Sequence, residues 1–529
     1  MTRGKMYAMS VAGGVAAGLT WSGVSGFLLF IVFIPLFVVE QHFYIRREKV
    51  FAFFPFAFLF FVSWNITAVW WLIPVHILGG ISVIILNTLL MSFLFLLFSI
   101  TKRNAGERSG YASLIFYWLA YEQILLWGDL SWPWLHLGNG FAGDIGAVQW
   151  YSYTGVAGGS LWVLMVNILL FSAWRGYSSL KRARGYIPHL ILITVIVAVP
   201  VIFSYSFFSA DKGSNGEKIK IAVLQPNLDP YTEKFRGMNR HERVDDLLKL
   251  LREFNVEKVD YVVAPETAID SVWLSRDNPH LKPLYDYIDQ HNIKTLITGG
   301  TTFEEVPCNI DDHAVRKTGD REICFRVYNS SLQLLSGEMD YYHKRMLVPG
   351  VENLPFHSFI PLPSFLMVDL GGVAGIYSKG EVTEVFSHPS VIGGAGQLVC
   401  FESAYGRLAA DAVREGAGFL SIITNDGWFR GTNGYMQHLR LSRLRAIETG
   451  RPVVRSANTG ISAIIDRRGV ILNRGDWMQR TVIEGEIIPG TEVTYYVAQG
   501  DYIGRTALLF TGLIMLSLLV KRFSGRGTR

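Results

Sequence analysis

Residues 51–73, FAFFPFAFLFFVSWNITAVWWLI, form a run of apolar and aromatic side chains that contains no charged residue. About 20 such residues in a helix cross the hydrocarbon core of a bilayer, which is ~30 Å thick. This stretch therefore predicts a membrane-spanning helix, and with it a chain whose fold is built partly in lipid.

The composition of the 529-residue chain agrees with this interpretation, because 50% of its residues are hydrophobic, only 18% are charged and the mean hydropathy is +0.27. The net charge of +5 is typical of basic cytoplasmic loops and does not indicate a nucleic-acid partner. The first apolar stretch contains clustered glycines, and a signal peptide is its alternative interpretation, but it lacks a convincing small-residue cleavage site. We therefore predict eight membrane helices, the other seven being 6–22, 25–41, 81–100, 112–128, 156–174, 187–208 and 505–520.

The loops between these stretches alternate in charge, which predicts their orientation. The loops after the first, third and fifth stretches contain no Lys or Arg, so we expect them outside. Seven crossings then leave residues 211–503 outside as a separate domain, between a membrane domain at 1–210 and a C-terminal helix and cytoplasmic tail at 504–529. The basic residues that mark cytoplasmic ends are Arg3, Lys5, Arg46, Arg47, Lys49, Lys102, Arg103, Arg108, Arg175, Lys181, Arg182 and Arg184.

The outer segment has the pattern of an α/β domain. Short β-branched runs end in turn-forming residues, and amphipathic helical stretches such as 434–449 lie between them. Strands that alternate with helices predict a layered α/β fold. The runs that predict strands are KIKIAVLQPN (218–227), VDYVVAPET (259–267), IKTLITGGT (293–301), GQLVCFES (396–403) and FLSIITND (419–426).

Three ionisable residues follow strand-like runs: Glu266, Lys344 and Cys400. A cysteine nucleophile needs a base, and a tetrahedral intermediate needs a positive or N–H donor beside its oxyanion. We expect Lys344 to lower the pKa of the Cys400 thiol. Each residue also has a structural interpretation, because free cysteine packs well in cores and buried charges often pair.

The residues around these positions resemble the nitrilase superfamily of Glu-Lys-Cys amidases and acyltransferases. The quoted motifs are APE (264–266), KRMLVPGVENLPF (344–356), CFES (400–403), TNDGWF (424–429) and RAIETGRPVVRSANTGISAIID (445–466). Together with the eight membrane stretches, they resemble the superfamily's membrane-embedded apolipoprotein N-acyltransferase family. The resemblance implies an α-β-β-α sandwich on the periplasmic side of a bacterial inner membrane.

The resemblance also implies roles for individual residues. Cys400 would carry an acyl chain as a thioester, with Glu266 as general base and Lys344 as oxyanion stabiliser. The backbone N–H of Phe401 would be a second oxyanion donor, and Glu352 would orient Lys344 or Glu266. Asn425 and Trp428 would line the substrate pocket, although a structural role for Trp428 is equally open.

The expected substrates are a phospholipid acyl donor and the N-terminal amine of a diacylglyceryl-cysteine on an apolipoprotein, with no metal or cofactor and a monomeric enzyme. A membrane-tethered amidase that hydrolyses its acyl-enzyme is the alternative, and a scaffolding or transporter-like membrane protein is a second. Cys308 and Cys324 are either a disulfide or two buried thiols. His438 is interpreted as structural, and Glu122 has either a helix-packing or a lipid-headgroup role.

Overall fold

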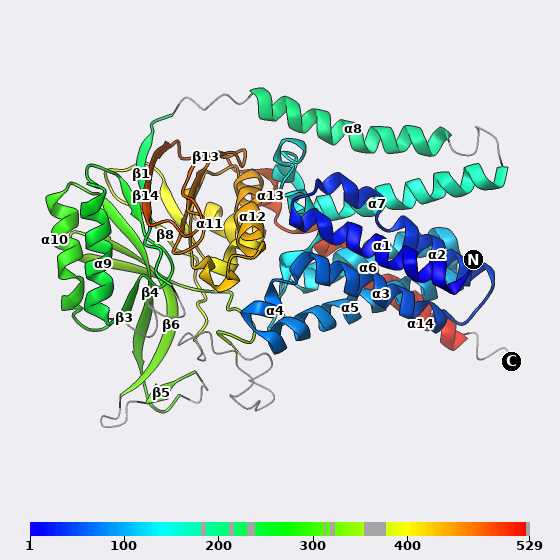
Figure 1. Ribbon diagram of the computed structural model, residues 1–529, viewed down its shortest axis with the longest axis horizontal. Coiled ribbons are helices and arrows are strands. Elements are labelled where there is room, and N and C mark those ends of the chain that lie inside the picture. The colour runs from blue at the N-terminus through cyan, green and yellow to red at the C-terminus, as the bar shows by residue number, and fades with distance from the viewer. Residues whose placement is uncertain are drawn as a thin grey trace. The chain divides into compact units, whose positions relative to one another are not determined.

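The computed structural model describes residues 1–180, 187–210, 216–229, 238–310, 314–317, 323–353 and 377–524. Contacts divide the chain into two compact units (Figure 1). Residues 1–210 and 499–529 form what we call the helical unit, and residues 211–498 form the sandwich unit. The C-terminal helix therefore belongs with the N-terminal helices. Three of the basic residues used to predict orientation, Lys181, Arg182 and Arg184, lie outside the described residues.

The helical unit has a helix at each of the eight predicted stretches. Six helical segments of the described chain are long and apolar enough to cross a membrane, and α1 and α6 are not among them. Eight crossings therefore stay a prediction. The main helices are α1 (Arg3–Leu19), α2 (Ile34–Ile45), α3 (Phe54–Val69), α4 (Leu72–Val75), α5 (Ile77–Ala105), α6 (Glu107–Ile124), α7 (Tyr151–Leu180), α8 (Ile187–Ala210) and α14 (Tyr502–Ser524).

The glycines of α1 have a packing role. A Cβ added at Gly14 would lie 2.1 Å from the Phe60 carbonyl oxygen, and one added at Gly18 would lie 2.4 Å from Thr67 Cβ. Both neighbours are on α3, so small residues let the two backbones approach closely, as is common between membrane helices. The glycines that reduce the hydropathy of this stretch are thus explained by helix packing.

Lys102 differs from its sequence interpretation. It was assigned to a cytoplasmic loop, but it lies in the last turn of α5 and its side chain is 0% exposed. Its Nζ lies 2.5 Å from Glu40 on α2. Lys102 is therefore a buried helix residue and not a loop residue, and its place at a cytoplasmic end stays a prediction. Arg103 lies beside it, and its guanidinium donates to the Glu48 carbonyl.

The loop after α6, which we expect on the outer side of the membrane, is folded into the helical unit. Most of residues 131–142 are buried in short 3₁₀ turns, η4 (Pro133–Leu135) and η5 (Leu137–Phe141). Glu122 on α6 accepts hydrogen bonds from the Leu137 N–H at 2.7 Å and from Trp118 Nε1 at 2.9 Å. Of the two interpretations of Glu122, helix packing or a lipid headgroup, these contacts support packing.

The sandwich unit contains two sheets. The first has the order β14-β1-β2-β4-β6-β5, with β3 paired to β4 and β7 paired to β6; the second has the order β13-β12-β11-β10-β9-β8. The strands of the first sheet are β1 (Ile219–Gln225), β2 (Tyr261–Val263), β3 (Ile269–Trp273), β4 (Thr295–Val306), β5 (Arg316–Lys317), β6 (Cys324–Leu335), β7 (Glu338–His343) and β14 (Thr481–Ile487). Those of the second are β8 (Val385–Phe386), β9 (Gly394–Val399), β10 (Ala417–Thr424), β11 (Val453–Ala457), β12 (Ala463–Ile465) and β13 (Ile471–Arg474).

Helices cover the outer face of each sheet, as Figure 1 shows. One apolar core joins α9 and α10 to the first sheet, and a second lies between the sheets, where Tyr261 packs edge-on against Phe419. The expected α-β-β-α layering is therefore confirmed. The helices are α9 (Arg240–Glu253), α10 (Lys282–Gln290), α11 (Gly406–Arg414), α12 (Gly434–Thr449) and the short α13 (Tyr495–Gln499).

Parallel pairing places the functional candidates together. β1, β2 and β4 are parallel neighbours in one sheet, and β9, β10 and β11 are parallel neighbours in the other. The carboxyl ends of parallel strands lie at one edge of a sheet, where ligands of α/β folds usually bind. Glu266 follows β2, Cys400 follows β9 and Asn425 follows β10.

Candidate active site

Cys400 lies on a sharp turn between β9 and α11. It begins a 3₁₀ turn, η11 (Cys400–Ala404), and has a φ of +53°. A left-handed conformation is costly for a residue with a Cβ and persists only where surrounding contacts impose it, often at functional sites. Since Cys308 and Cys324 are joined, Cys400 is the free cysteine of the chain.

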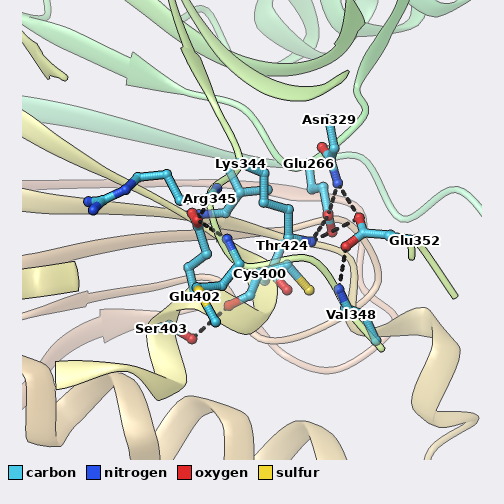
Figure 2. A network of polar contacts seen from close by, with 12 residues as sticks. Glu266, Asn329, Lys344, Arg345, Val348, Glu352, Cys400, Glu402, Ser403 and Thr424 are labelled. Carbon is cyan, nitrogen blue, oxygen red and sulfur yellow. Dashed lines mark hydrogen bonds and ion pairs between the residues drawn. The ribbon is translucent and has the colours of Figure 1, made fainter. Parts of the chain in front are cut away.

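Lys344 lies between two carboxylates directly after β7 (Figure 2). Its side chain is 1% exposed, and its Nζ is 3.0 Å from Glu352 Oε1 and 3.4 Å from Glu266 Oε1. Burial by itself would lower the pKa of the ammonium, but Glu352 and Glu266 outweigh burial and raise it. Lys344 is therefore a permanent positive charge at neutral pH.

Glu266 reaches this cluster from the end of β2, where the neighbouring strand approaches closely. A Cβ added at Gly299 on β4 would lie 2.5 Å from Glu266 Cα, so this position of the TGG run needs a glycine. The Glu266 side chain is buried. The structure thus brings Glu266, Lys344 and Glu352 into contact across up to 86 positions of sequence.

Asn329 on β6 joins the two carboxylates and was not predicted. Its Nδ2 donates to Glu266 Oε1 and to Glu352 Oε1, each at 2.8 Å. Because carboxylate oxygens only accept, the amide nitrogen rather than the amide oxygen faces them. The backbone carbonyl of Asn329 also accepts from the Lys344 N–H at 2.9 Å. No sequence signal distinguishes Asn329, since its importance depends on pairing between β6, β4 and β7.

The environment of the Cys400 thiol is dominated by burial, which raises its pKa well above the ordinary value. Glu266 raises the pKa further, while Lys344 and a hydrogen bond from Thr424 lower it without cancelling the rise. Lys344 therefore lowers the pKa of the Cys400 thiol, as predicted, but burial and Glu266 outweigh this effect and the net pKa is raised. The resting residue is a thiol, so a base must take its proton when it attacks.

Glu402 ties the cysteine turn to the lysine loop, and its role was also not predicted. Its carboxylate accepts hydrogen bonds from the backbone N–H groups of Val399, Arg345 and Met346 at 2.8, 2.6 and 3.0 Å, and from the Tyr342 hydroxyl. Burial raises the pKa of Glu402 despite these donors. The signal available in the sequence was its position two residues after Cys400.

A second polar cluster lies behind Cys400. Asp426 accepts from His438 Nδ1 at 2.9 Å and from Arg455 at 2.6 Å, and His438 Nε2 lies 3.1 Å from the Cys400 carbonyl oxygen. Burial would raise the pKa of Asp426, but Arg455 and His438 outweigh it and lower the pKa to about 2. These bonds agree with the structural interpretation of His438.

The remaining predicted residues lie at the same strand ends. Phe401 directly follows Cys400 in the turn, and its buried ring packs edge-on against Tyr405. Asn425 is buried at the end of β10, where its side-chain oxygen accepts from Asn458 Nδ2 at 3.2 Å. Trp428 lies in the turn η12 (Asp426–Phe429) and is half-buried. Their proposed substrate contacts stay predictions.

Comparisons with known proteins match both parts of the chain. The carbon-nitrogen hydrolase family matches residues 220–494, and the apolipoprotein N-acyltransferase N-terminal domain matches residues 13–169. The apolipoprotein N-acyltransferase of Chlorobaculum tepidum is 27% identical over 94% of this chain and 92% of its own length, and that of Geobacter metallireducens is 28% identical over 75% and 72%. The crystal structure of Nit3 from Saccharomyces cerevisiae, of the nitrilase superfamily, covers 52% of this chain and 91% of its own at 18% identity, with a TM-score of 0.36.

Proposed function

This chain belongs to the carbon-nitrogen hydrolase family, as one of the nitrilase superfamily's apolipoprotein N-acyltransferases, and on that premise we propose that it transfers an acyl chain from a phospholipid through a thioester on Cys400. The acceptor is the α-amino group of the diacylglyceryl-cysteine that begins an apolipoprotein. The catalytic residues are Cys400, Glu266 and Lys344, with Phe401 as a backbone donor.

The observation that carries this proposal is the placement of Lys344. One buried ammonium contacts two buried carboxylates, Glu266 and Glu352, and it acts electrostatically on the thiol of Cys400. Such a cluster has an excess of negative charge and a nucleophile beside it. It can supply a base, a nucleophile and an electrostatic stabiliser for an oxyanion.

In the first half-reaction, Glu266 takes the thiol proton while the sulfur attacks the ester carbonyl of the phospholipid. Lys344 and the Phe401 N–H donate to the oxyanion of the tetrahedral intermediate. The intermediate collapses, the ester C–O bond breaks, and the lysophospholipid oxygen receives the proton from Glu266. The products are the Cys400 thioester and a lysophospholipid.

In the second half-reaction, the neutral α-amine attacks the thioester carbonyl. An α-amino group has an ordinary pKa near 8, so a useful fraction is neutral at pH 7. Glu266 takes the proton of the attacking amine as the new C–N bond forms. The C–S bond then breaks, the sulfur regains a proton, and the acceptor carries its third acyl chain as an amide.

The membrane site of this reaction is supported by the helical unit and by the disulfide. Both substrates carry acyl chains that hold them at a bilayer, and six segments of the described chain can span one. The Cys308–Cys324 disulfide is typical of proteins in oxidising compartments such as the bacterial periplasm. We therefore propose a bacterial inner-membrane enzyme, active as a monomer, whose sandwich unit faces the periplasm.

The reaction is tested with purified enzyme and a phospholipid that carries a labelled acyl chain. We expect the phospholipid alone to load one hydroxylamine-labile acyl chain onto Cys400, and a diacylated lipopeptide to discharge it as an N-terminal amide. Cys400→Ser should form no labile adduct. The matched control is Cys308→Ser with Cys324→Ser, which keeps Cys400 and should still be acylated.

Two results would contradict the proposal. One is native-rate acylation of the lipopeptide by folded Cys400→Ser, and the other is the absence of any acyl-enzyme with phospholipid alone. Release of free fatty acid in place of the amide would assign the chain to the alternative, a membrane-tethered amidase.

Orientation is tested separately with reporter fusions. Reporters after residues 110 and 184 should behave as cytoplasmic, and those within 211–500 as external. A cytoplasmic sandwich unit would contradict the proposed site of action, because an oxidising compartment and the lipoprotein acceptor are then on the other side.

A further inference from the structure

Thr424 is a buried hydroxyl that has two polar neighbours, Asp426 and Cys400, and a single hydrogen to donate. It is the last residue of β10 and is 0% exposed. Its Oγ1 donates to Asp426 Oδ1 at 3.0 Å, and Figure 2 shows its side chain beside that of Cys400, where it lowers the pKa of the thiol. Because a hydroxyl carries one hydrogen, it donates to one of these partners at a time.

Asp426 does not depend on Thr424. The carboxylate also accepts from His438 Nδ1 and from Arg455, which is fully buried and carries a permanent charge. If the Thr424 hydrogen turns away, Asp426 keeps two strong donors. The hydroxyl is therefore able to change partner at little cost, since a charge-assisted bond lost at one anion is replaced by another at a second anion.

We propose that Thr424 is a catalytic hydroxyl that donates to Asp426 while Cys400 is a thiol and turns to donate to Cys400 Sγ when the sulfur becomes an anion. This assignment deepens the proposed function, on which the timing of the turn within the reaction rests. Thr424 transfers no proton of its own and stabilises the sulfur anion by a hydrogen bond.

In the proposed first half-reaction, the Thr424 hydroxyl changes partner as the proton leaves Cys400. The Cys400 S–H bond breaks, its electron pair stays on sulfur and its proton goes to Glu266. The Thr424 O–H rotates from Asp426 Oδ1 to Sγ without breaking. When the C–S bond of the thioester forms, the sulfur loses its negative charge and the hydroxyl returns to Asp426; the same exchange recurs when the thioester is resolved and sulfur leaves.

The surroundings of the sulfur explain why such a donor is needed. A thiolate at Cys400 is disfavoured by burial, by Glu266, which follows β2, and by Asp426, which follows β10. Lys344, which follows β7, favours it. Lys344 is shared with two carboxylates, and Phe401 contributes to the oxyanion in the proposed reaction. Thr424 is thus a neutral donor that stabilises the thiolate without adding another charge to the cluster.

His438 and Ser403 lie at the backbone carbonyl of Cys400 and not at its sulfur. The Ser403 hydroxyl donates to the Cys400 carbonyl at 2.8 Å, and His438 Nε2 lies 2.8 Å from Ser403 Oγ. These bonds fix the backbone of the strained turn and leave the sulfur free of them. The Ser403 and His438 contacts therefore act on the backbone of the turn, whereas Thr424 acts on the sulfur.

The test is the pH profile of alkylation of Cys400 by iodoacetamide, measured by mass spectrometry on the whole purified protein. No substrate is needed, and the other two cysteines are joined as a disulfide. Thr424→Val keeps the shape and removes the hydroxyl, so we expect alkylation about tenfold slower at a given pH and a profile about one pH unit higher. Thr424→Ser keeps the hydroxyl and should follow the native profile.

The matched control is Ser421→Ala, which removes another buried hydroxyl from the same strand and should leave the profile unchanged. Melting temperatures of all variants show whether each protein is folded. A Thr424→Val profile that superimposes on the native one overturns the proposal, and so does an equal loss in Thr424→Ser, because that indicates a packing role. Alkylation is independent of acyl transfer, so either result is distinguishable from failure of the proposed function.

Discussion

Among the residues that the structure describes, two lysines are fully buried, one in each unit, and their partners differ in charge. Lys102 of the helical unit has one carboxylate partner, Glu40, and the rest of its coordination is neutral: Gln41 Oε1 at 2.6 Å and the Tyr111 hydroxyl at 3.4 Å. Glu40 is completed by the Ser99 hydroxyl at 2.8 Å. This cluster is neutral and closed by aromatic rings.

Lys344 of the sandwich unit has two carboxylate partners and a thiol nearby. Glu266 and Glu352 together outweigh its single charge, and Asn329 holds both in place. The comparison teaches that burial of a lysine does not by itself indicate chemistry. A balanced pair joins helices, whereas a cluster of two carboxylates and one ammonium beside a thiol has the groups that the proposed reaction needs as base and oxyanion donor.

The largest effect is expected at Lys102. Lys102→Met leaves the Glu40 charge buried without its counter-ion, which typically costs about 3–5 kcal/mol of stability. The double variant Lys102→Met with Glu40→Leu should recover most of this loss. Thermal unfolding in detergent measures both, while acyl transfer per folded molecule should stay native. A loss of acyl transfer in folded Lys102→Met would show that Lys102 is needed for the reaction and not only for stability.

At Lys344 the loss should appear in the rate. Lys344→Met removes the proposed oxyanion donor, and removal of one such donor typically slows a reaction by about 10²–10³. Adding Glu352→Gln relieves the excess negative charge and should raise the melting temperature without restoring the rate. Single-turnover formation of the acyl-enzyme is the measurement. If the double variant regains native rates, Lys344 is a structural residue like Lys102.

The Asp426 cluster is a third case beside those of Lys102 and Lys344. Its carboxylate is paired with one cation, Arg455, yet it lies close to Cys400. Its carboxyl has a pKa of about 2 against an ordinary value of 3.8. Because the pKa of Asp426 is lower in the folded protein than in the unfolded chain, its ionisation adds about 2 kcal/mol to the free energy of unfolding above about pH 4. This contribution is lost as the pH falls through about 2. The melting-temperature difference between the native protein and Asp426→Asn should therefore shrink between pH 4 and pH 2. A difference that is independent of pH would contradict the ionised state of Asp426.

The smallest effect is expected at Glu352. Glu352→Gln removes one negative charge from the surroundings of Lys344. Its single oxygen can accept from Asn329 and Lys344, as Oε1 does, but the acceptor that Oε2 offers to the Val348 N–H is then lost. Lys344 then pairs with Glu266 alone, and this pairing competes with proton transfer to Glu266, so we expect acyl-enzyme formation to slow about tenfold. A loss as large as that of Lys344→Met would show that Glu352 does more than position its neighbours.

The elements of the fold were largely predictable from local patterns. The apolar runs became helices, the β-branched runs became strands, and the predicted helix 434–449 is α12 with the same bounds. The cysteine was predictable from its place after a strand and from the motifs around it. Asn329 and Thr424 were not, because polar residues within or at the end of a strand look alike until the strand order places them beside a charge.

The sequence by itself determined which segments form apolar helices and which form the sandwich. It also determined that Glu266, Lys344 and Cys400 follow strands, because hydrophobic periodicity and turn residues act over a few positions. Only the tertiary structure decided which charges are paired. Lys102 looked like a loop charge and is buried against Glu40, 62 positions away, while Lys344 and Glu266 meet across 78 positions. Such pairs depend on helix packing and strand order, and these decide whether a buried ammonium fastens two helices or lies beside a nucleophile.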